Sequence, residues 1–326
     1  MRDISLDLVR VTEAAAIAAY DYIGSGNKKM IDQVATEAMR FRLNNMNFYG
    51  EVIIGEGEKD EAPGLFNGER VGKYAFTKDY DPGSLKAPDF QVYDIAVDPI
   101  DGTTQTSISG PEAVSVIGVS LGGTMLRTDA YYMEKLVWGP TVERKRKLID
   151  DHDYVLGLHQ DLMFNVRFVA DALRLPTNNV TVCILDRPRH ERAIETLRKN
   201  RVKIKLIQDC DVSGAIATCR RNSGVHLLYG IGGGPEAVIT ACAIKSLRGG
   251  METQECNKDL GWQTTGDIYN TEALVKGPCV FAATGVTDGS ILEGVKVRKE
   301  EKRKTHSVFM RSESGTERLI TAYHGN

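Results

Sequence analysis

The first forty residues place apolar side chains at a helical period. Apolar residues within 4–22 recur at steps of three and four, and a glycine-containing turn at 24–26 ends the pattern. A second helix follows. Its buried face is expected to consist of Ile31, Val34, Ala38 and Phe41. The chain is therefore predicted to begin with two amphipathic helices.

Short apolar runs then predict strands at 51–54, 92–97 and 113–121. Between them, residues 74–91 combine Pro, Gly and charged positions without any period. This composition indicates an exposed excursion from the fold.

Beyond residue 142 strand-like runs alternate with helical patterns. The strands are expected at 180–185, 202–207, 225–229 and 279–284, and the helices at 191–199, 213–220 and 236–247. This alternation is typical of an α/β fold with a largely parallel sheet.

The fold class is thus predicted as α/β in two lobes. An α+β lobe spans residues 1–142 and carries most candidate metal ligands, and an α/β lobe spans 143–326 and carries the candidate substrate-binding loops. The basic run 142–147 is interpreted as a solvated linker at the boundary.

The composition excludes several classes of protein. The chain has 326 residues, 42% hydrophobic and 26% charged, with a net charge of −3, which argues against nucleic-acid binding. No long apolar run predicts a membrane span, and an acidic N-terminus is unlike a signal peptide, so a cytoplasmic protein is expected. The six cysteines form no CxxC pair, which argues against disulfides and zinc.

The sequence Asp98-Pro-Ile-Asp101-Gly102-Thr103 carries the strongest chemical signal. It follows a predicted strand, and a turn there can direct both carboxylates to one point. Hard carboxylate oxygens suit Mg²⁺ or Mn²⁺. The alternative is an acidic turn without a ligand.

Three further residues before this motif are candidates. Glu56 lies between glycines after a strand, although such loops are more often simply solvated. Asp32 is expected in the first turn of its helix, where the helix dipole alone could account for it. Lys28, four residues earlier, could meet a phosphate or be a surface lysine.

Strand ends in the second half supply other groups. Residues 186–190 (DRPRH) suit phosphate recognition, residues 209–211 (DCD) offer acceptors for sugar hydroxyls, and residues 230–236 (GIGGGPE) place Glu236 at a helix start. The last run fails as a dinucleotide-binding fingerprint because its sixth position is proline. No GxxxxGK[ST] or HExxH motif occurs.

Several carboxylate loops together predict a site for two or more divalent ions, as in metal-dependent phosphoryl transfer. No Ser, Cys or His is placed as a covalent nucleophile, so a metal-activated water is expected to attack. Thr103 could hold this water, and Asp32 could accept its proton.

Eight segments resemble a known family. GNKKMID, VIIGEGEKDEAP, DIAVDPIDGTT, YYMEKL, DRPRH, QDCDVS, LYGIGGGPEAV and FAATGVTDG match in order and spacing, over roughly residues 8 to 324, the class II (GlpX-type) fructose-1,6-bisphosphatases. These belong to the wider lithium-sensitive phosphatase superfamily. The resemblance implies a layered α/β/α/β/α sugar-phosphatase fold and hydrolysis of the 1-phosphate of fructose 1,6-bisphosphate in gluconeogenesis. It also implies Mn²⁺ or Mg²⁺ as cofactor and a homo-oligomer, dimer or tetramer.

The resemblance also assigns residues by motif. The implied metal ligands are Asp32, Glu56, Asp98, Asp101 and Glu236. The implied substrate contacts are Asp101, Gly102, Thr103, Tyr132, Arg187, Pro188, Arg189, Asp209, Cys210, Asp211 and Gly233. Lys28 matches a family lysine, and with Asp32 and Thr103 it completes the predicted catalytic set.

The chain departs from the family pattern at a few places. Asp101 replaces the usual glutamate, and Cys210 replaces the usual glycine of a DGD motif. Residues 250–278 look short, and 74–91 look inserted. A bifunctional fructose-1,6-/sedoheptulose-1,7-bisphosphatase, an inositol-monophosphatase-like enzyme and a catalytically silent sugar-phosphate-binding protein remain as alternatives.

Overall fold

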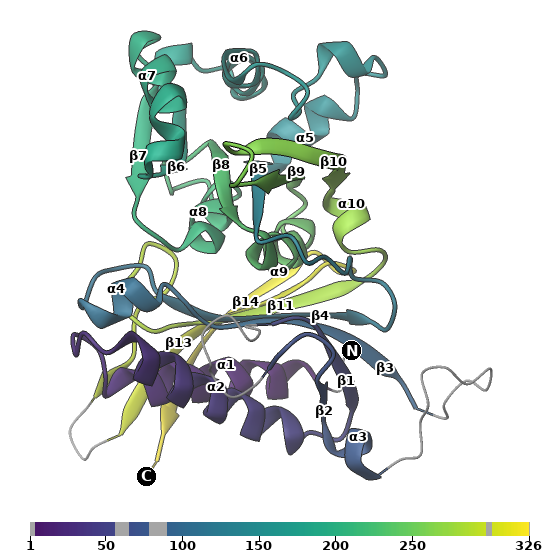
Figure 1. Cartoon of the computed structure of the whole chain (residues 1–326), viewed down its shortest axis with the longest axis vertical. Helices are drawn as coiled ribbons and strands as arrows, with labels where there is room; N and C mark the ends of the chain where they lie inside the picture. The colour runs from purple at the N-terminus through teal and green to yellow at the C-terminus, as the bar shows by residue number, and fades with distance from the viewer. Residues whose placement is uncertain (1–3, 56–64, 78–89, 298–301, 326) are drawn as a thin grey trace. The chain divides into compact units, whose positions relative to one another are not determined.

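The computed structural model describes residues 4–55, 65–77, 90–297 and 302–325 (Figure 1). The chain divides into two compact units. The first unit comprises Met1–Arg127 and Val275–Asn326, and the second comprises Thr128–Leu274. Each unit is built around its own mixed sheet, which confirms the predicted α/β class. The five-layer order implied by the resemblance stays a prediction.

The sheet of the first unit joins strands from both ends of the chain. Its strands are β1 (Tyr49–Ile54), β2 (Arg70–Val71), β3 (Val92–Asp101), β4 (Val114–Leu121), β11 (Cys279–Gly285), β12 (Lys296–Val297), β13 (Arg303–Arg311) and β14 (Thr316–His324). The order is β12-β13-β11-β4-β3-β1-β2, with β14 on the other side of β13. Among the described strands, β1 and β3 are parallel and the other neighbours are antiparallel.

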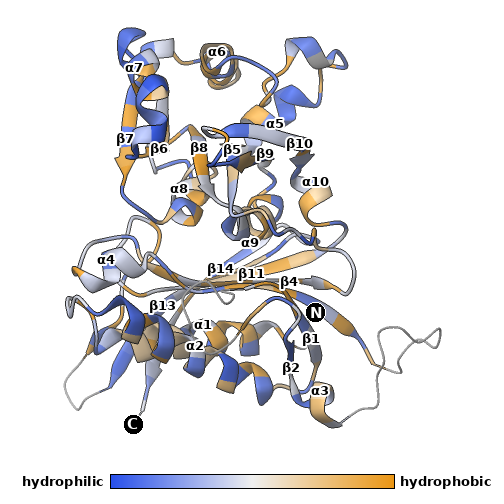
Figure 2. Cartoon of the chain, viewed as in Figure 1, coloured by the Kyte–Doolittle hydropathy of each residue, from blue (hydrophilic) through white to orange (hydrophobic). Residues whose placement is uncertain are grey.

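Two helices cover one face of this sheet, as the periodicity predicts. They are α1 (Ser5–Tyr20) and α2 (Lys28–Asn44), and they pack on each other and on the central strands. The core beneath them takes alternate residues of each strand, such as Ile95, Val97 and Ile117. Figure 2 shows β4 and β11 coloured largely hydrophobic.

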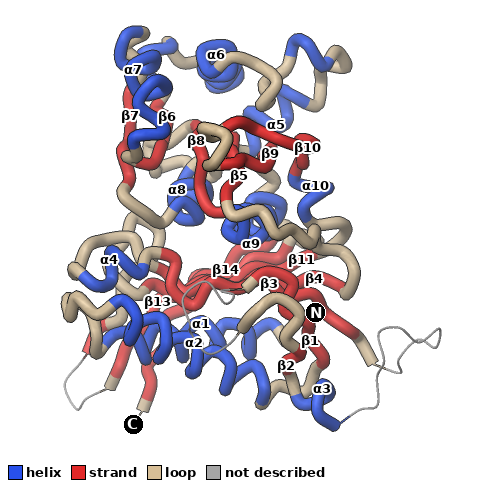
Figure 3. Tube along the Cα trace, in the orientation of Figure 1, coloured by secondary structure: helices blue, strands red, loops and turns tan. Residues whose placement is uncertain are grey.

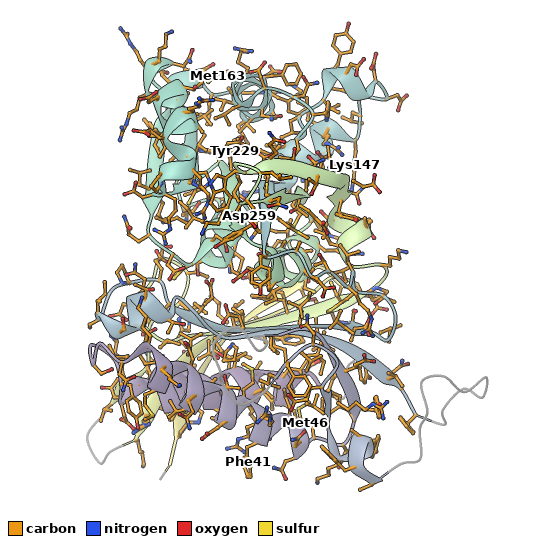
Figure 4. The ribbon with its side chains drawn as sticks, viewed as in Figure 1. Phe41, Met46, Lys147, Met163, Tyr229 and Asp259 are labelled. Atoms are coloured by element: carbon orange, nitrogen blue, oxygen red, sulfur yellow. The ribbon has the colours of Figure 1, made fainter. Side chains whose placement is uncertain are left out.

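The buried stripe of α2 differs from the predicted one. Ile31 is buried, but the stripe continues through Ala35, Met39 and Leu43, at steps of four. Phe41, labelled in Figure 4, is 66% exposed. The prediction was therefore wrong for Val34, Ala38 and Phe41. Its first step of three, from Ile31 to Val34, turned the predicted stripe away from the true packing face.

Two short helices complete the description of the first unit. They are α3 (Lys73–Thr77) and α4 (Thr103–Ser107). Helix α3 covers the start of the predicted 74–91 excursion, and residues 78–89 of that excursion lie outside the described residues.

The second unit contains a mixed sheet rather than the expected largely parallel one. Its strands are β5 (Tyr132–Trp138), β6 (Thr181–Leu185), β7 (Lys203–Ile207), β8 (Leu227–Gly233), β9 (Gly250–Asn257) and β10 (Gln263–Asn270). The order is β10-β9-β5-β8-β6-β7. Only β6 runs parallel to its neighbours β7 and β8; β5, β9 and β10 add antiparallel pairs. The sequence interpretation missed these three strands because their polar positions hide the strand period.

Helices cover both faces of this second sheet (Figure 3). They are α5 (Pro140–Arg146), α6 (Leu162–Leu173), α7 (Glu191–Lys199), α8 (Asp211–Ala217), α9 (Gly234–Ser246) and α10 (Thr271–Leu274), with the 3₁₀ turns η2 (His152–Tyr154), η3 (Thr177–Asn179) and η4 (Pro188–His190). Helices α5 and α6 share a core with Val182 and Leu227. Gly214 of α8 approaches the alternate residues Cys183 and Leu228, so α8 lies on the opposite face.

The division of the chain differs from the lobes predicted at 142 and 143. Residues 128–142 belong to the second unit, and the basic run 142–147 lies mostly within helix α5. Residues 279–284 form β11, which pairs with β4 and β13 of the first sheet. Strand periodicity identified β11 but carried no information on its partners. In the described part of the chain, no helix is both long and apolar enough to cross a membrane.

Candidate active site

A bulge in β3 brings Asp98 and Asp101 onto one face of the sheet. Two residues three positions apart in a regular strand point to opposite faces. Here Asp98 pairs with Val116 and Asp101 with Val114, so the extra residue in β3 is absorbed by a register shift. Both carboxylates are buried, and the Ile100 N–H donates to Asp98 Oδ1 at 2.9 Å. Both residues therefore lie within the strand, on one face, rather than in a turn after it; a common metal site stays a prediction.

Gly102 allows a helix to begin directly after these carboxylates. It has φ 104°, a left-handed conformation that favours glycine, and it is the N-cap of α4. Helix α4 thus starts at Thr103, and the Thr103 hydroxyl donates to Asp32 Oδ1 at 2.7 Å. The Ile100 carbonyl lies 3.1 Å from the same hydroxyl. The Asp32 carboxylate is the closer and stronger acceptor for the single proton of the Thr103 hydroxyl.

Asp32 and Lys28 occupy different helical positions from those predicted. Helix α2 begins at Lys28 with Asn27 as N-cap, so Asp32 lies in the second turn rather than the first. The dipole explanation for Asp32 is correspondingly weaker, because that effect falls off after the first turn. Lys28 is exposed, and its Nζ donates to Thr104 Oγ1 at 2.9 Å. The structure thus connects α2 and α4 through two side-chain contacts.

The turn before α2 is fixed to the same short helix. The Gly24 and Gly26 N–H groups donate to the carbonyls of Thr106 and Ser107 at 2.9 Å each. Both glycines have positive φ. Lys28 is therefore held beside α4 in two ways, by its own side chain and by the backbone of the preceding turn.

Glu56 lies outside the described residues, which stop at Gly55 and resume at Leu65. Strand β1 is parallel to β3, and Ile54 pairs with Ala96, two residues before Asp98. A Cβ at Gly55 would lie 1.8 Å from the Leu65 carbonyl oxygen, so only glycine fits there. The Gly55 N–H donates to Asn67 Oδ1 at 2.9 Å.

The donor chemistry of this region suits hard divalent cations. Carboxylates are the ligands that Mg²⁺ and Mn²⁺ prefer, and Asp98 and Asp101 present them from one strand face. Within the described residues, no group of three or more His, Cys, Asp or Glu side chains is arranged to hold a metal ion. The remaining predicted ligands are Asp32 on α2, Glu56 outside the described residues and Glu236 in the second unit.

In the second unit, two arginines follow the end of β6. Arg187 donates to the carbonyls of Asp186 and Gln208, and Arg189 donates through Nε and Nη2 to the Ile231 carbonyl at 3.0 and 2.7 Å. Neither forms an ion pair with a carboxylate among the described residues. Burial lowers the pKa of Arg189, although a guanidinium stays protonated. The strand end therefore carries two arginines whose hydrogen bonds go to main-chain carbonyls, with Asp211 close enough to act on the pKa of Arg189.

His190, beside these arginines, is a structural group. It is buried, and its Nε2 accepts from the Ile231 N–H at 2.7 Å. Its Nδ1 therefore carries the proton and donates to the Leu185 carbonyl at 2.8 Å. Burial lowers its pKa, so the neutral form is favoured. His190 fixes the backbone around Arg189 and Ile231.

The start of α8 contains an ion pair that the sequence interpretation missed. Lys135 of β5 is 2% exposed, and its Nζ lies 2.7 Å from Asp211 Oδ2. A Cβ at Gly232 would lie 2.1 Å from the same oxygen. Lys135 stands within the YYMEKL segment, but a lysine at a core-facing strand position gives no recognisable pattern on its own.

Cys210 has the backbone conformation of a glycine. It is the N-cap of α8 with φ 65°, and it is buried. This left-handed conformation explains why a glycine suits the position, and Asp209 and Asp211 flank it.

Tyr132, Gly233 and Glu236 lie near one another in the second unit. Tyr132 pairs with Gly233 across β5 and β8, and a Cβ at Gly233 would lie 1.9 Å from Glu236 Oε2. The Glu236 carboxylate thus folds over the N-cap of α9, where the helix dipole favours an anion. Pro188 is exposed in the 3₁₀ turn η4.

The fold and these strand-end groups first define a class. The chain is an α/β protein with two carboxylates on one face of a bulged strand in one unit and two arginines at a strand end in the other. Comparison with known proteins then narrows this class to a family.

The family model described as bacterial fructose-1,6-bisphosphatase, glpX-encoded, matches residues 2–324. The chain is 36% identical to fructose-1,6-bisphosphatase 1 class 2 of Escherichia coli K12, over 99% of this chain and 95% of that protein. Fructose-1,6-bisphosphatase class 2 of Shigella flexneri gives the same values. The chain therefore belongs to the GlpX-type class II fructose-1,6-bisphosphatase family of phosphatases, as its motifs predict.

Proposed function

We propose that this chain hydrolyses the 1-phosphate of fructose 1,6-bisphosphate to give fructose 6-phosphate and phosphate. The family membership supports the substrate, and the relatives with that name match nearly the whole chain. One structural observation carries the chemistry: the bulge that places Asp98 and Asp101 on one strand face, directly before the helix that begins at Thr103.

Asp98 and Asp101 would hold divalent cations, Mg²⁺ or Mn²⁺, together with Asp32, Glu56 and Glu236. When bound, such ions polarise a phosphoryl oxygen and lower the pKa of a water. Asp101 is one methylene shorter than the family's usual glutamate, and the bulge places its carboxylate on the same face as Asp98.

Thr103 and Asp32 would position the attacking water and accept its proton. The Thr103 hydroxyl donates a hydrogen bond to Asp32, so its oxygen can accept a hydrogen bond from a water. Asp32 can then accept the proton in general-base catalysis. Lys28, held beside Thr104, would contribute positive charge for the phosphate.

The second unit also carries groups suited to a sugar phosphate. Arg187 and Arg189 carry charge that no described carboxylate neutralises, which suits the phosphate that is not hydrolysed. Asp209 and Asp211 would accept hydrogen bonds from sugar hydroxyls. Gly102, Tyr132, Pro188, Cys210 and Gly233 are the remaining proposed contacts.

A phosphate-release assay over a panel of sugar phosphates tests this proposal. We expect turnover of fructose 1,6-bisphosphate with Mg²⁺ or Mn²⁺ and none with excess EDTA. Hydrolysis in ¹⁸O-labelled water should place the label in phosphate. Full activity in EDTA would contradict the metal-dependent mechanism, and a preference for inositol monophosphate would contradict the substrate. A cytoplasmic location and a dimer or tetramer remain predictions.

A further inference from the structure

Arg189 packs against two aromatic rings of the second unit. Its guanidinium carbon is 4.8 Å from the ring centre of Trp262 and 5.5 Å from that of Tyr132. The two rings meet edge to face, with centres 5.0 Å apart. Tyr132 is among the predicted substrate contacts, whereas no sequence motif identified Trp262.

These rings hold a cation without neutralising it. Arg189 has five N–H donors, and two of its nitrogens donate to the single Ile231 carbonyl. An aromatic face attracts a guanidinium through its quadrupole and leaves the net charge in place, whereas a carboxylate would cancel it. Burial raises the pKa of the nearby Cys256 thiol to about 11, so that group is neutral as well. Asp211 is close enough to act on the pKa of Arg189, but no carboxylate forms an ion pair with Arg189 among the described residues. The guanidinium charge therefore remains available to an anion.

Trp262 is placed by the turn between β9 and β10. The backbone N–H of Trp262 donates to the Asn257 carbonyl at 2.9 Å, and Asn257 pairs with Gln263 across the hairpin. Cys256, one residue earlier, pairs with Tyr132. Asp259, labelled in Figure 4, marks this turn. The hairpin register thus brings the Trp262 ring to the Tyr132 ring.

Trp262 adopts an unfavourable backbone conformation in this turn. Its φ is 67°, in the left-handed region that large side chains rarely occupy. Its side chain is half-buried, while Leu260 in the same turn is 53% exposed. The contacts of the Trp262 ring offset this strain, and they are made with Arg189 and Tyr132.

We propose that Trp262 is a positioning residue that fixes the Arg189 guanidinium for binding a phosphate group of the substrate. The inference rests on the proposed function for the identity of that substrate. Packing against Trp262 restricts the guanidinium to one plane, so its remaining N–H groups are already oriented when the phosphate arrives. Trp262 acts through Arg189 and does not itself need to touch the substrate.

Steady-state kinetics of three variants test the positioning role. In Trp262→Leu, we expect KM for fructose 1,6-bisphosphate to rise about tenfold, with kcat within about twofold. Trp262→Phe retains an aromatic face and should recover most of the loss. Leu260→Ala, in the same turn, is the matched control and should behave as wild type. An unchanged KM in Trp262→Leu, or a Phe variant as impaired as the Leu variant, would overturn the proposal.

Tryptophan fluorescence provides a test that does not depend on turnover. The chain has two tryptophans, Trp138 and Trp262. Trp138 is 1% exposed, and its Nε1–H donates a hydrogen bond to Glu143. Without divalent cations, fructose 6-phosphate or inorganic phosphate should change the emission of the wild type saturably. The change should disappear in Trp262→Phe, which retains only Trp138, and in Arg189→Ala.

The two assays distinguish failure of the inference from failure of the proposed function. A phosphate-dependent change in Trp262 emission, without turnover of fructose 1,6-bisphosphate, supports the positioning role and contradicts the substrate. Normal turnover with an emission that saturating fructose 6-phosphate leaves unchanged overturns the positioning role alone. Absence of both turnover and emission change contradicts both.

Discussion

The two units hold opposite charges by different physical means. In the first unit, Asp98 and Asp101 are brought together by an irregularity of the backbone, a bulge followed by a left-handed glycine. In the second unit, Arg187 and Arg189 are held by main-chain carbonyls, and Arg189 also by two aromatic rings. Among the described residues, neither arginine forms an ion pair with a carboxylate.

The difference shows which parts of a site depend on local sequence. A bulge and a helix start can be specified within six consecutive residues, and the segment 98–103 contains all of them. The surroundings of Arg189 come from β5, β8 and the β9–β10 turn, which are far apart in the sequence. Substitutions in the first unit should therefore affect chemistry most, and substitutions in the second should affect binding or stability.

Asp98→Asn should have the largest effect. A neutral amide is a poorer ligand for a hard cation, so we expect kcat to fall by ~10⁴-fold or more, corresponding to several kcal/mol of lost charge stabilisation. Circular dichroism should show an unchanged fold. Asp7→Asn, an exposed carboxylate on α1, is the control and should retain full activity. Wild-type turnover in Asp98→Asn would remove Asp98 from the proposed metal ligands.

Thr103→Val should follow, with a loss of ~10²–10⁴-fold in kcat, the usual contribution of a positioned proton-transfer group. Valine keeps the shape and removes the hydroxyl that donates to Asp32. Thr103→Ser restores that hydroxyl and should regain substantial activity. Equal activity of the Val and Ser variants would show that the hydrogen bond has no role in the reaction.

In the first unit, the sequence predicted local elements better than the pairing of distant strands. The 98–103 motif, α1 and the region of α2 were identified, because local spacing determines them. The return of β11, β13 and β14 to the first sheet was not predicted. Strand β11 pairs with β4, which lies more than 150 positions earlier in the chain. Glu56 lies outside the described residues, so its proposed role stays a prediction.

In the second unit, the sequence identified the loops but not what supports them. The residues Arg187, Arg189 and Asp211 were identified as candidates from their motifs. Lys135 and Trp262 were missed, because only the mixed sheet brings Lys135 to Asp211 and the hairpin brings Trp262 to Arg189. Cys210 was recognised as a departure from the family's glycine. The structure adds its positive φ, which explains why glycine suits this position.

Lys135→Met tests the support beneath the second unit's substrate loop. Removing one partner of a buried pair leaves the Asp211 carboxylate uncompensated, which should cost about 3–5 kcal/mol of unfolding free energy. Adding Asp211→Asn should recover part of this loss. Lys145→Met, which breaks a surface pair with Asp171, should cost at most about 1 kcal/mol. Urea denaturation measures all three, and equal losses for Lys135 and Lys145 would contradict the argument.

Arg189→Ala should affect binding rather than chemistry. Losing a charge-assisted contact should cost about 1.5–3 kcal/mol. We expect this cost to appear as an increase in KM for fructose 1,6-bisphosphate with little change in kcat. Arg192→Ala, an exposed arginine on α7, is the control. A fall in kcat with unchanged KM would place Arg189 with the catalytic groups and break the division between the two units.

Cys210→Gly should produce the smallest change, and it should be stabilising. A side chain in the left-handed region costs about 1–2 kcal/mol, and glycine removes that strain. Glycine also gains freedom in the unfolded chain, which offsets about 0.5–1 kcal/mol. The net gain is therefore at most about 1.5 kcal/mol, measurable as a higher urea midpoint. Cys210→Ala keeps the Cβ and its strain, so it should show no gain. If the Ala variant were stabilised as much as the Gly variant, loss of the thiol rather than relief of backbone strain would be responsible.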